Sequence, residues 1–136
     1  MMTQIIAVYG SLRRGSYANG LLKGAKYLGQ DKISGDLYSL GNYPGLLLDS
    51  DEPVLVDLYL LPEDDEGLLI SIDRYEGYFN DDEEDSLFVR RKVTTLEGVL
   101  EVYIYEYNGT ILPQYHTAIP SGDWFDCKGE SEGLSS

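Results

Sequence analysis

The stretch Gln4-Ile-Ile-Ala-Val-Tyr-Gly-Ser-Leu12 joins a short apolar, partly β-branched run to a turn at Gly10. Such a run, ending at glycine, is typical of a buried strand, so residues 4–9 are predicted to form the first strand of a sheet. Beyond the strand, consecutive backbone N–H groups are free to face a cavity, where they can bind a carboxylate or a developing oxyanion. The alternative interpretation is a plain turn between two elements.

Apolar patterning in the rest of the chain indicates an α+β fold. Strands are predicted over residues 27–40 (broken near Gln30-Asp31 and Gly35), 46–48, 54–60, 88–96 and 99–107, the last two joined by a turn at Glu97-Gly98. Helices are predicted over residues 16–25 and 62–76. Ser16 is the expected cap of the first helix, Pro62 suits the first turn of the second, and Gly77 suits its end. Because helices and strands do not alternate, we expect a small, mostly antiparallel, barrel-like sheet with two flanking helices.

The chain has 136 residues, which fits one domain, predicted here over residues 1–128 with a flexible tail at 129–136. Its single cysteine, Cys127, excludes an internal disulfide, and the single histidine, His116, has no assigned role. The sequence contains no metal-binding cluster, no secretion signal and no run of roughly 20 apolar residues. A cytoplasmic protein without metal or other cofactor is therefore expected, with its oligomeric state open.

The net charge is −14, which argues against nucleic acid as a partner, and the lack of a long apolar run argues against a membrane. Residues 1–32 nevertheless carry a net charge of +4, so the remainder of the chain sums to −18. An anionic ligand is therefore expected at the N-terminal segment rather than elsewhere. The acidic loops at 62–66 and 81–85 fit a role in solubility, and a protein-interaction role for them stays open.

Glu76 is a candidate general base at the end of the second predicted helix. That end is the negative pole of the helix dipole, and Asp73 adds a like charge nearly one turn earlier. Tyr75 and Tyr78 are placed to exclude water. Each influence raises the pKa of a partly buried carboxyl, as a general base working near neutral pH requires. A solvated helix end is the alternative interpretation.

Several short motifs follow one another along the chain. They are Tyr9-Gly-Ser-Leu12, Asn42-Tyr-Pro-Gly45, Asp73-x-Tyr-Glu-Gly-Tyr78, Leu87-Phe-Val-Arg-Arg91 and Tyr107-Asn-Gly109. In this order, over residues 4–125, they resemble the gamma-glutamylcyclotransferase-like family, which includes AIG2-like and YtfP-like proteins. The resemblance implies a small barrel-like fold and an enzyme that cyclises a small-molecule gamma-glutamyl substrate to 5-oxoproline, with release of an amine or amino acid.

The resemblance also implies roles for individual residues. The loop that holds the gamma-glutamyl group corresponds to Tyr9, Gly10, Ser11 and Leu12, and the acid/base corresponds to Glu76. Five further residues match no motif role and are left as possible neighbours of the site: Arg13, Arg14, Tyr43, Tyr78 and Tyr105. Two other functions stay open, a cyclotransferase restricted to gamma-glutamylamines and a non-catalytic module that binds a small molecule in the same fold.

Overall fold

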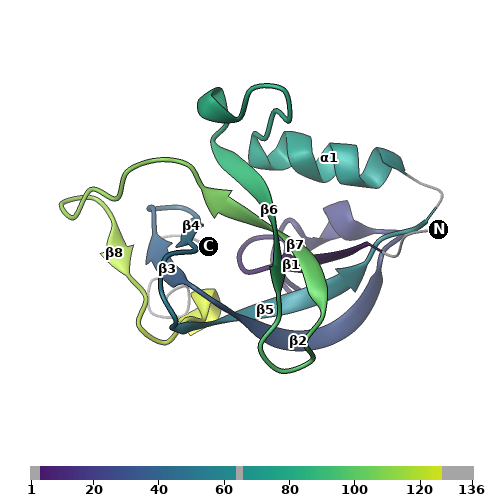
Figure 1. The fold of residues 1–136 in the computed structure, drawn as a ribbon, viewed down its shortest axis with the longest axis horizontal. Helices are drawn as coiled ribbons and strands as arrows, with labels where there is room; N and C mark the ends of the chain where they lie inside the picture. Colours follow the sequence, from purple (N-terminus) through teal and green to yellow (C-terminus); the bar gives the residue numbers. More distant parts are fainter. Residues whose placement is uncertain (1–3, 64–65, 127–136) are drawn as a thin grey trace.

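The computed structural model describes residues 4–63 and 66–126, and within them strands form two sheets (Figure 1). The larger sheet has the order β2 (Lys26–Ser34), β5 (Pro53–Leu60), β1 (Ile5–Val8), β7 (Glu101–Tyr107) and β6 (Phe88–Thr94). The smaller has the order β4 (Pro44–Leu47), β3 (Asp36–Ser39) and β8 (Thr117–Ala118). β1 runs parallel to β7, and the other neighbouring strands are antiparallel. The predicted α+β class is confirmed, with a sheet that is curved rather than closed.

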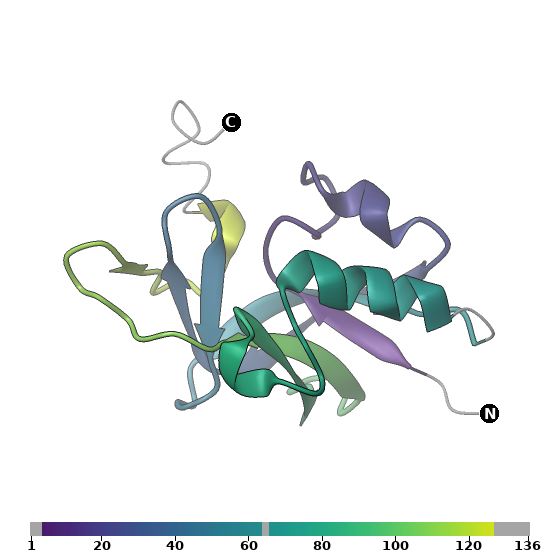
Figure 2. The ribbon, with the colours of Figure 1, turned by 90° about the horizontal axis from the view of Figure 1, so that it is seen from above.

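The second predicted helix is present as α1 (Glu66–Glu76), which lies across one face of the larger sheet, near β1 (Figure 2). It begins at Glu66 and not at Pro62 as predicted, and residues 64–65 lie outside the described part of the chain. Its predicted end is correct, because Gly77 follows it with φ = 72°. Glycine takes this left-handed conformation without the steric cost that a Cβ brings.

The first predicted helix, over residues 16–25, is wrong. A short 3-10 helix, η1 (Asn19–Leu22), takes its place and is preceded by Ala18 rather than capped by Ser16. Glycine disfavours the α-helix, and Gly24 has φ = 102°, which an α-helix cannot contain. The predicted pair of flanking helices is therefore one α-helix and one 3-10 turn; a further 3-10 turn, η2 (Glu83–Asp85), lies between α1 and β6.

Both faces of β1 are buried, which explains its uninterrupted apolar sequence. Ile6 and Val8 belong to a core that includes Ile72 of α1. Ala7 belongs to a second core on the opposite face, because successive side chains of a strand point to opposite sides. Trp124, near the C-terminal end of the described residues, is also buried in this second cluster. The end of β1 is thus held rigidly between two cores.

The loop between β6 and β7 folds onto β2, at the far edge of the sheet. The N–H of Leu96 donates to the carbonyl of Lys32 at 2.8 Å. The carboxylate of Asp31 accepts from the N–H groups of Glu97 at 3.0 Å and Gly98 at 2.8 Å. The hairpin strands therefore stop two residues short of the predicted turn on each side. This contact brings the two sheet edges together at one end without a ladder between β2 and β6.

No helix in the described part of the chain has the length and apolar character needed to cross a bilayer. The predicted tail at 129–136 and Cys127 lie outside the described residues, so the domain boundary at residue 128 stays a prediction.

Candidate active site

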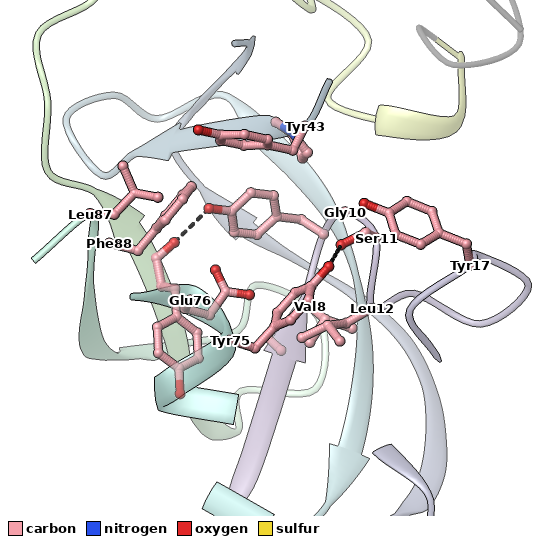
Figure 3. A pocket seen from close by; sticks show the side chains of 14 residues that line it. Val8, Gly10, Ser11, Leu12, Tyr17, Tyr43, Tyr75, Glu76, Leu87 and Phe88 are labelled. Carbon is pink, nitrogen blue, oxygen red and sulfur yellow. Dashed lines mark hydrogen bonds between the residues drawn. The ribbon is translucent and has the colours of Figure 1, made fainter. Parts of the chain in front are cut away.

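A cavity of about 250 Å³ lies where the loop after β1, the end of α1 and the start of β6 meet (Figure 3). Its lining consists of Ala7, Val8, Tyr9, Gly10, Ser11, Leu12, Tyr17, Tyr43, Pro44, Tyr75, Glu76, Leu87, Phe88 and Tyr105. The structure therefore brings the loop of residues 9–12 and Glu76 into one space, although they are far apart in the sequence.

The loop after β1 leaves three backbone N–H groups for a ligand. Among residues 4–63 and 66–126, no acceptor is bonded to the N–H of Gly10, Ser11 or Leu12. The loop is pressed against Pro44, since a Cβ at Gly10 would lie 2.6 Å from the Pro44 Cγ atom. A ligand oxygen can accept from such preorganised N–H groups without any reorganisation of the loop.

The end of α1 is fixed by backbone hydrogen bonds around Gly77. The N–H of Gly77 donates to the carbonyl of Arg74 at 3.2 Å, and the N–H of Tyr78 donates to that of Asp73 at 2.9 Å. With the left-handed Gly77, these bonds form a Schellman motif, which ends a helix at a defined residue. Glu76 is consequently the last residue of α1, and its direction follows from the motif.

The Glu76 carboxylate points into the cavity, between Phe88 and the pair formed by Ser11 and Tyr75 (Figure 3). Within the described part of the chain, no donor or cation is bonded to it. Burial raises the pKa of this carboxyl to about 7, and the negative charge of Asp73 contributes in the same direction. Glu76 therefore gains and loses a proton near neutral pH.

Two hydrogen bonds made by hydroxyl groups join the walls of the cavity. The Ser11 Oγ and the Tyr75 hydroxyl are hydrogen-bonded at 2.7 Å, which ties the loop after β1 to α1. The Tyr9 hydroxyl donates to the backbone carbonyl of Tyr105 at 2.6 Å. Burial raises the pKa of Tyr9 well above its usual range, so this side chain stays neutral and serves as a donor.

Asp73 is bonded to both strands of the β6–β7 hairpin. Arg90 Nη1 donates to Asp73 Oδ2 at 2.7 Å, and the Tyr105 hydroxyl donates to Asp73 Oδ1. Burial, together with the negative Asp73, raises the pKa of the Tyr105 hydroxyl, which keeps it protonated. The carboxylate of Asp73, nearly one turn before Glu76, is thus held in place by the Arg90 guanidinium and the neutral Tyr105 hydroxyl.

Of the five possible neighbours, Tyr43 and Tyr105 line the cavity, whereas Tyr78, Arg13 and Arg14 do not. The side chain of Tyr78 instead donates a hydrogen bond to Glu83 at 3.1 Å.

The two arginines are engaged elsewhere. Arg13 is buried and forms ion pairs with Asp57 at 3.5 Å and with Asp123 at 2.7 Å. The guanidinium of Arg14 lies 4.8 Å from the ring centre of Tyr27. The positive charge of the N-terminal segment is thus not in the cavity, and the backbone N–H groups are the remaining anion-binding feature there. No group of three or more His, Cys, Asp or Glu side chains in the described residues is arranged to hold a metal ion.

Sequence reasoning assigned no role to Pro44, Tyr17, Leu87 and Phe88, which line the cavity, or to Tyr75 as the partner of Ser11. Pro44 and Leu87-Phe88 lie in motifs that were visible in the sequence, so a signal existed for their importance. Their contact with the loop after β1 is a long-range feature, and local patterning carries no information about it. Tyr17 lies in no such motif.

Residues 6–126 match the family described as "Gamma-glutamyl cyclotransferase, AIG2-like". A protein of Vibrio cholerae serotype O1, named "Putative gamma-glutamylcyclotransferase", is 31% identical over 125 residues, which cover 90% of this chain and 96% of that protein.

Solved structures agree with this match. Protein ytfP of Escherichia coli has a TM-score of 0.64 and 26% identity, covering 92% of this chain and 99% of its own. An AIG2-like protein of Mus musculus shares the fold, with a TM-score of 0.63 and 20% identity, over 85% of this chain and 83% of its own. The chain therefore belongs to the gamma-glutamyl cyclotransferase, AIG2-like family.

Proposed function

We propose that the protein is a gamma-glutamylcyclotransferase-type enzyme, which converts a gamma-glutamyl compound into 5-oxoproline and a free amine or amino acid. One observation carries the proposal: a carboxyl group with a pKa of about 7, Glu76, shares a cavity with three unpaired N–H groups at residues 10–12. Membership of the family supports the general reaction, and the cavity geometry supports the residue roles.

In the proposed reaction, Glu76 takes a proton from the α-ammonium group of the substrate. The freed amine attacks the gamma-carbonyl carbon of the same molecule and closes a five-membered ring. The N–H groups of Gly10, Ser11 and Leu12 stabilise the negative charge that develops on the carbonyl oxygen. The bond from the gamma-carbon to the leaving nitrogen breaks as Glu76 returns its proton to that nitrogen, and Glu76 then takes the second proton from the ring nitrogen and passes it to the released amine. No water is consumed, so exclusion of water by the aromatic walls favours cyclisation over hydrolysis.

The enzyme gains much of its rate by holding the substrate folded. Intramolecular attack is fast when the reacting atoms are held about 3–3.5 Å apart and aligned. Walls formed by Tyr43, Phe88 and the Ser11–Tyr75 pair surround the space next to Glu76, and in this proposal they hold the substrate in the bent conformation.

The test is release of 5-oxoproline from a panel of gamma-glutamyl amino acids and gamma-glutamylamines. Glu76→Gln keeps the shape of the side chain but removes the base, so kcat is expected to fall by about 10²–10⁴-fold. Glu101→Gln, which removes an acidic group on an exposed part of β7, is the matched control and should retain full activity. Full turnover by Glu76→Gln would remove Glu76 from the acid/base role. Tight binding of panel compounds by the wild type without release would support a binding module instead.

A second candidate, a preference for gamma-glutamylamines, is favoured by the charge of the cavity. None of its lining residues is a lysine, arginine or histidine. A leaving amino acid brings a second carboxylate, which would lack a cationic partner there and would face a chain of net charge −14. A leaving amine brings no such charge. Comparison of kcat/KM between matched pairs of substrates, with and without the second carboxylate, decides between the two.

A further inference from the structure

Asp73 is linked to Glu76 through both its backbone and its side chain. Its carbonyl accepts the Tyr78 N–H in the motif that ends α1, so its backbone is part of the turn that directs Glu76. Its carboxylate is held from outside the helix by Arg90 and Tyr105. The last turn of α1 is thus joined to the β6–β7 hairpin through this side chain, next to a backbone bond in which the Leu87 N–H donates to the Gly77 carbonyl at 3.0 Å.

The two donors converge because of the strand register. Arg90 and Tyr105 are direct partners in the antiparallel ladder of β6 and β7, so their side chains project from the same face of the sheet. The Arg90 guanidinium also lies near the rings of Tyr78 and Tyr103, with its central carbon 5.3 Å and 4.9 Å from the ring centres. Contact with two rings restricts the rotamers of Arg90 and limits the directions of its donors.

We infer that Asp73 is a positioning residue for Glu76: held between Arg90 and Tyr105, it fixes the last turn of α1 on the β6–β7 hairpin and aims the Glu76 carboxylate into the cavity. The catalytic consequences of this inference rest on the proposed function, whereas its structural and electrostatic consequences do not. A misplacement of about 1 Å in a reacting group can cost 10²-fold in rate, so this attachment matters even though Asp73 is absent from the cavity lining.

The negative charge of Asp73 also acts on Glu76. The polar and charged groups around these two carboxyl groups are Tyr75 on α1, Tyr9 and Ser11 after β1, Tyr43 before β4, Arg90 on β6 and Tyr105 on β7. Arg90 forms an ion pair with Asp73, and the negative charge of Asp73 favours the protonated form of Glu76. One side chain therefore bears on both the position and the proton affinity of Glu76, and two kinds of variant can separate these two effects.

The first variant changes the charge. Asp73→Asn keeps the side-chain size but removes the negative charge, so the pKa of Glu76 should fall below its wild-type value of about 7 while burial still holds it above 4.5. The titration is followed by NMR of 13C-labelled glutamate side chains, with Glu76→Gln identifying the resonance. Since this measurement needs no substrate, it remains informative if the protein turns over none of the panel compounds.

The second set of variants changes the attachment. Arg90→Gln removes the cation that holds Asp73 and should lower kcat by about 10–10²-fold with a smaller change in KM. Arg90→Lys keeps a cationic donor and should recover most of the activity. Arg91→Gln, at the next position of β6, removes an arginine that pairs with Glu83 and Glu106 instead, and should leave kcat unchanged.

The outcomes are distinct. In Asp73→Asn, the acidic limb of the rate profile should move to lower pH, because a base of lower pKa stays deprotonated there. The inference is wrong if Asp73→Asn folds and its Glu76 has the same pKa as in the wild type. It is also wrong if Arg90→Gln has the same kcat as Arg91→Gln. If Asp73→Asn does not fold, the comparison of Arg90→Gln with Arg90→Lys decides alone. A wild type that turns over nothing, with a Glu76 pKa that falls in Asp73→Asn, would overturn the proposed function but not this inference.

Discussion

Glu76 combines two properties that a carboxylate on the surface lacks. It is directed into a cavity, and it has a pKa near neutrality because burial opposes its charge. The same burial means that the ionised form is less well solvated in the folded protein than in the unfolded chain. A group placed in this way is suited to move protons and at the same time lowers the stability of the fold.

This cost is measurable without any substrate. Because the pKa of Glu76 is raised in the folded state, its protonated form stabilises the fold below pH 4.5, and that contribution is lost as the pH rises through about 7. Glu76→Gln should therefore be more stable than the wild type above pH 7, by on the order of 3 kcal/mol at most, with little difference near pH 4.5. Thermal unfolding of both proteins across this range checks it. A difference that does not depend on pH would contradict the raised pKa.

Position 10 requires a glycine because the loop after β1 lies too close to Pro44 for a side chain there. Gly10→Ala places a Cβ 2.6 Å from the Pro44 Cγ atom, so the loop and the proline must move apart. We expect a loss of about 1–3 kcal/mol in the free energy of unfolding and a lower kcat, since the N–H groups shift with the loop. Gly20→Ala is the control, because nothing lies within 4 Å of a Cβ there. Denaturant unfolding and 5-oxoproline release measure both effects, and equal behaviour of the two variants would count against this role of Gly10.

At the level of elements, the end of α1 determines where Glu76 points. Gly77→Ala forces a Cβ into φ = 72° and to 3.1 Å from the Leu87 Cβ, so the end of the helix should shift. We expect a cost of about 1–2 kcal/mol and a fall in kcat of at least tenfold. Gly24→Ala has a comparable conformational strain at φ = 102° but lies after η1, away from the cavity lining. The Gly24→Ala variant should therefore be less stable than the wild type but have the same kcat per folded molecule. A Gly77→Ala enzyme with wild-type kcat would contradict the argument.

The elements also show what sequence patterns can predict. β1, β5 and the end of α1 were predicted because an apolar run, or a glycine at a helix end, carries local information. The helix over residues 16–25 was wrong because glycines outweighed its apolar spacing, giving only η1. The two hairpin strands were predicted to be longer than they are. The Asp31 carboxylate, on a strand distant in sequence, accepts hydrogen bonds from the N–H groups of the turn, and local patterning does not show this. β8 pairs by only two residues, which leaves no pattern to detect.

For the site, the motifs identified residues 9–12 and Glu76, and the structure places them in one cavity. Their partners were not predictable in the same way. The bonds from Ser11 to Tyr75 and from Asp73 to Arg90 join residues that are distant in sequence, so only the folded chain reveals them. The expectation of a cationic anion site near the N-terminus followed from charge counting, which does not show that Arg13 is already paired with Asp57 and Asp123.

At the scale of the whole molecule, the net charge of −14 should discriminate among substrates. A gamma-glutamyl amino acid has a net charge of −1, whereas a gamma-glutamylamine with a neutral side group has none. Repulsion of the anion is screened as ionic strength rises, since the Debye length falls to about 8 Å at 0.15 M salt. KM for the amino acid conjugate should therefore fall with added salt, while that of the neutral amine conjugate should stay constant. Parallel salt dependence of the two would show that the molecular charge has no such effect.

The most direct measurement is a crystal structure of the Glu76→Gln variant with a gamma-glutamyl compound bound. We expect the gamma-carbonyl oxygen within hydrogen-bonding distance of the N–H groups of Gly10, Ser11 or Leu12, and the α-amino nitrogen facing the side chain at position 76. The substrate should be bent, with that nitrogen close to the gamma-carbonyl carbon. A ligand bound outside the cavity, or one whose α-amino group faces away from position 76, would contradict the proposed cyclisation.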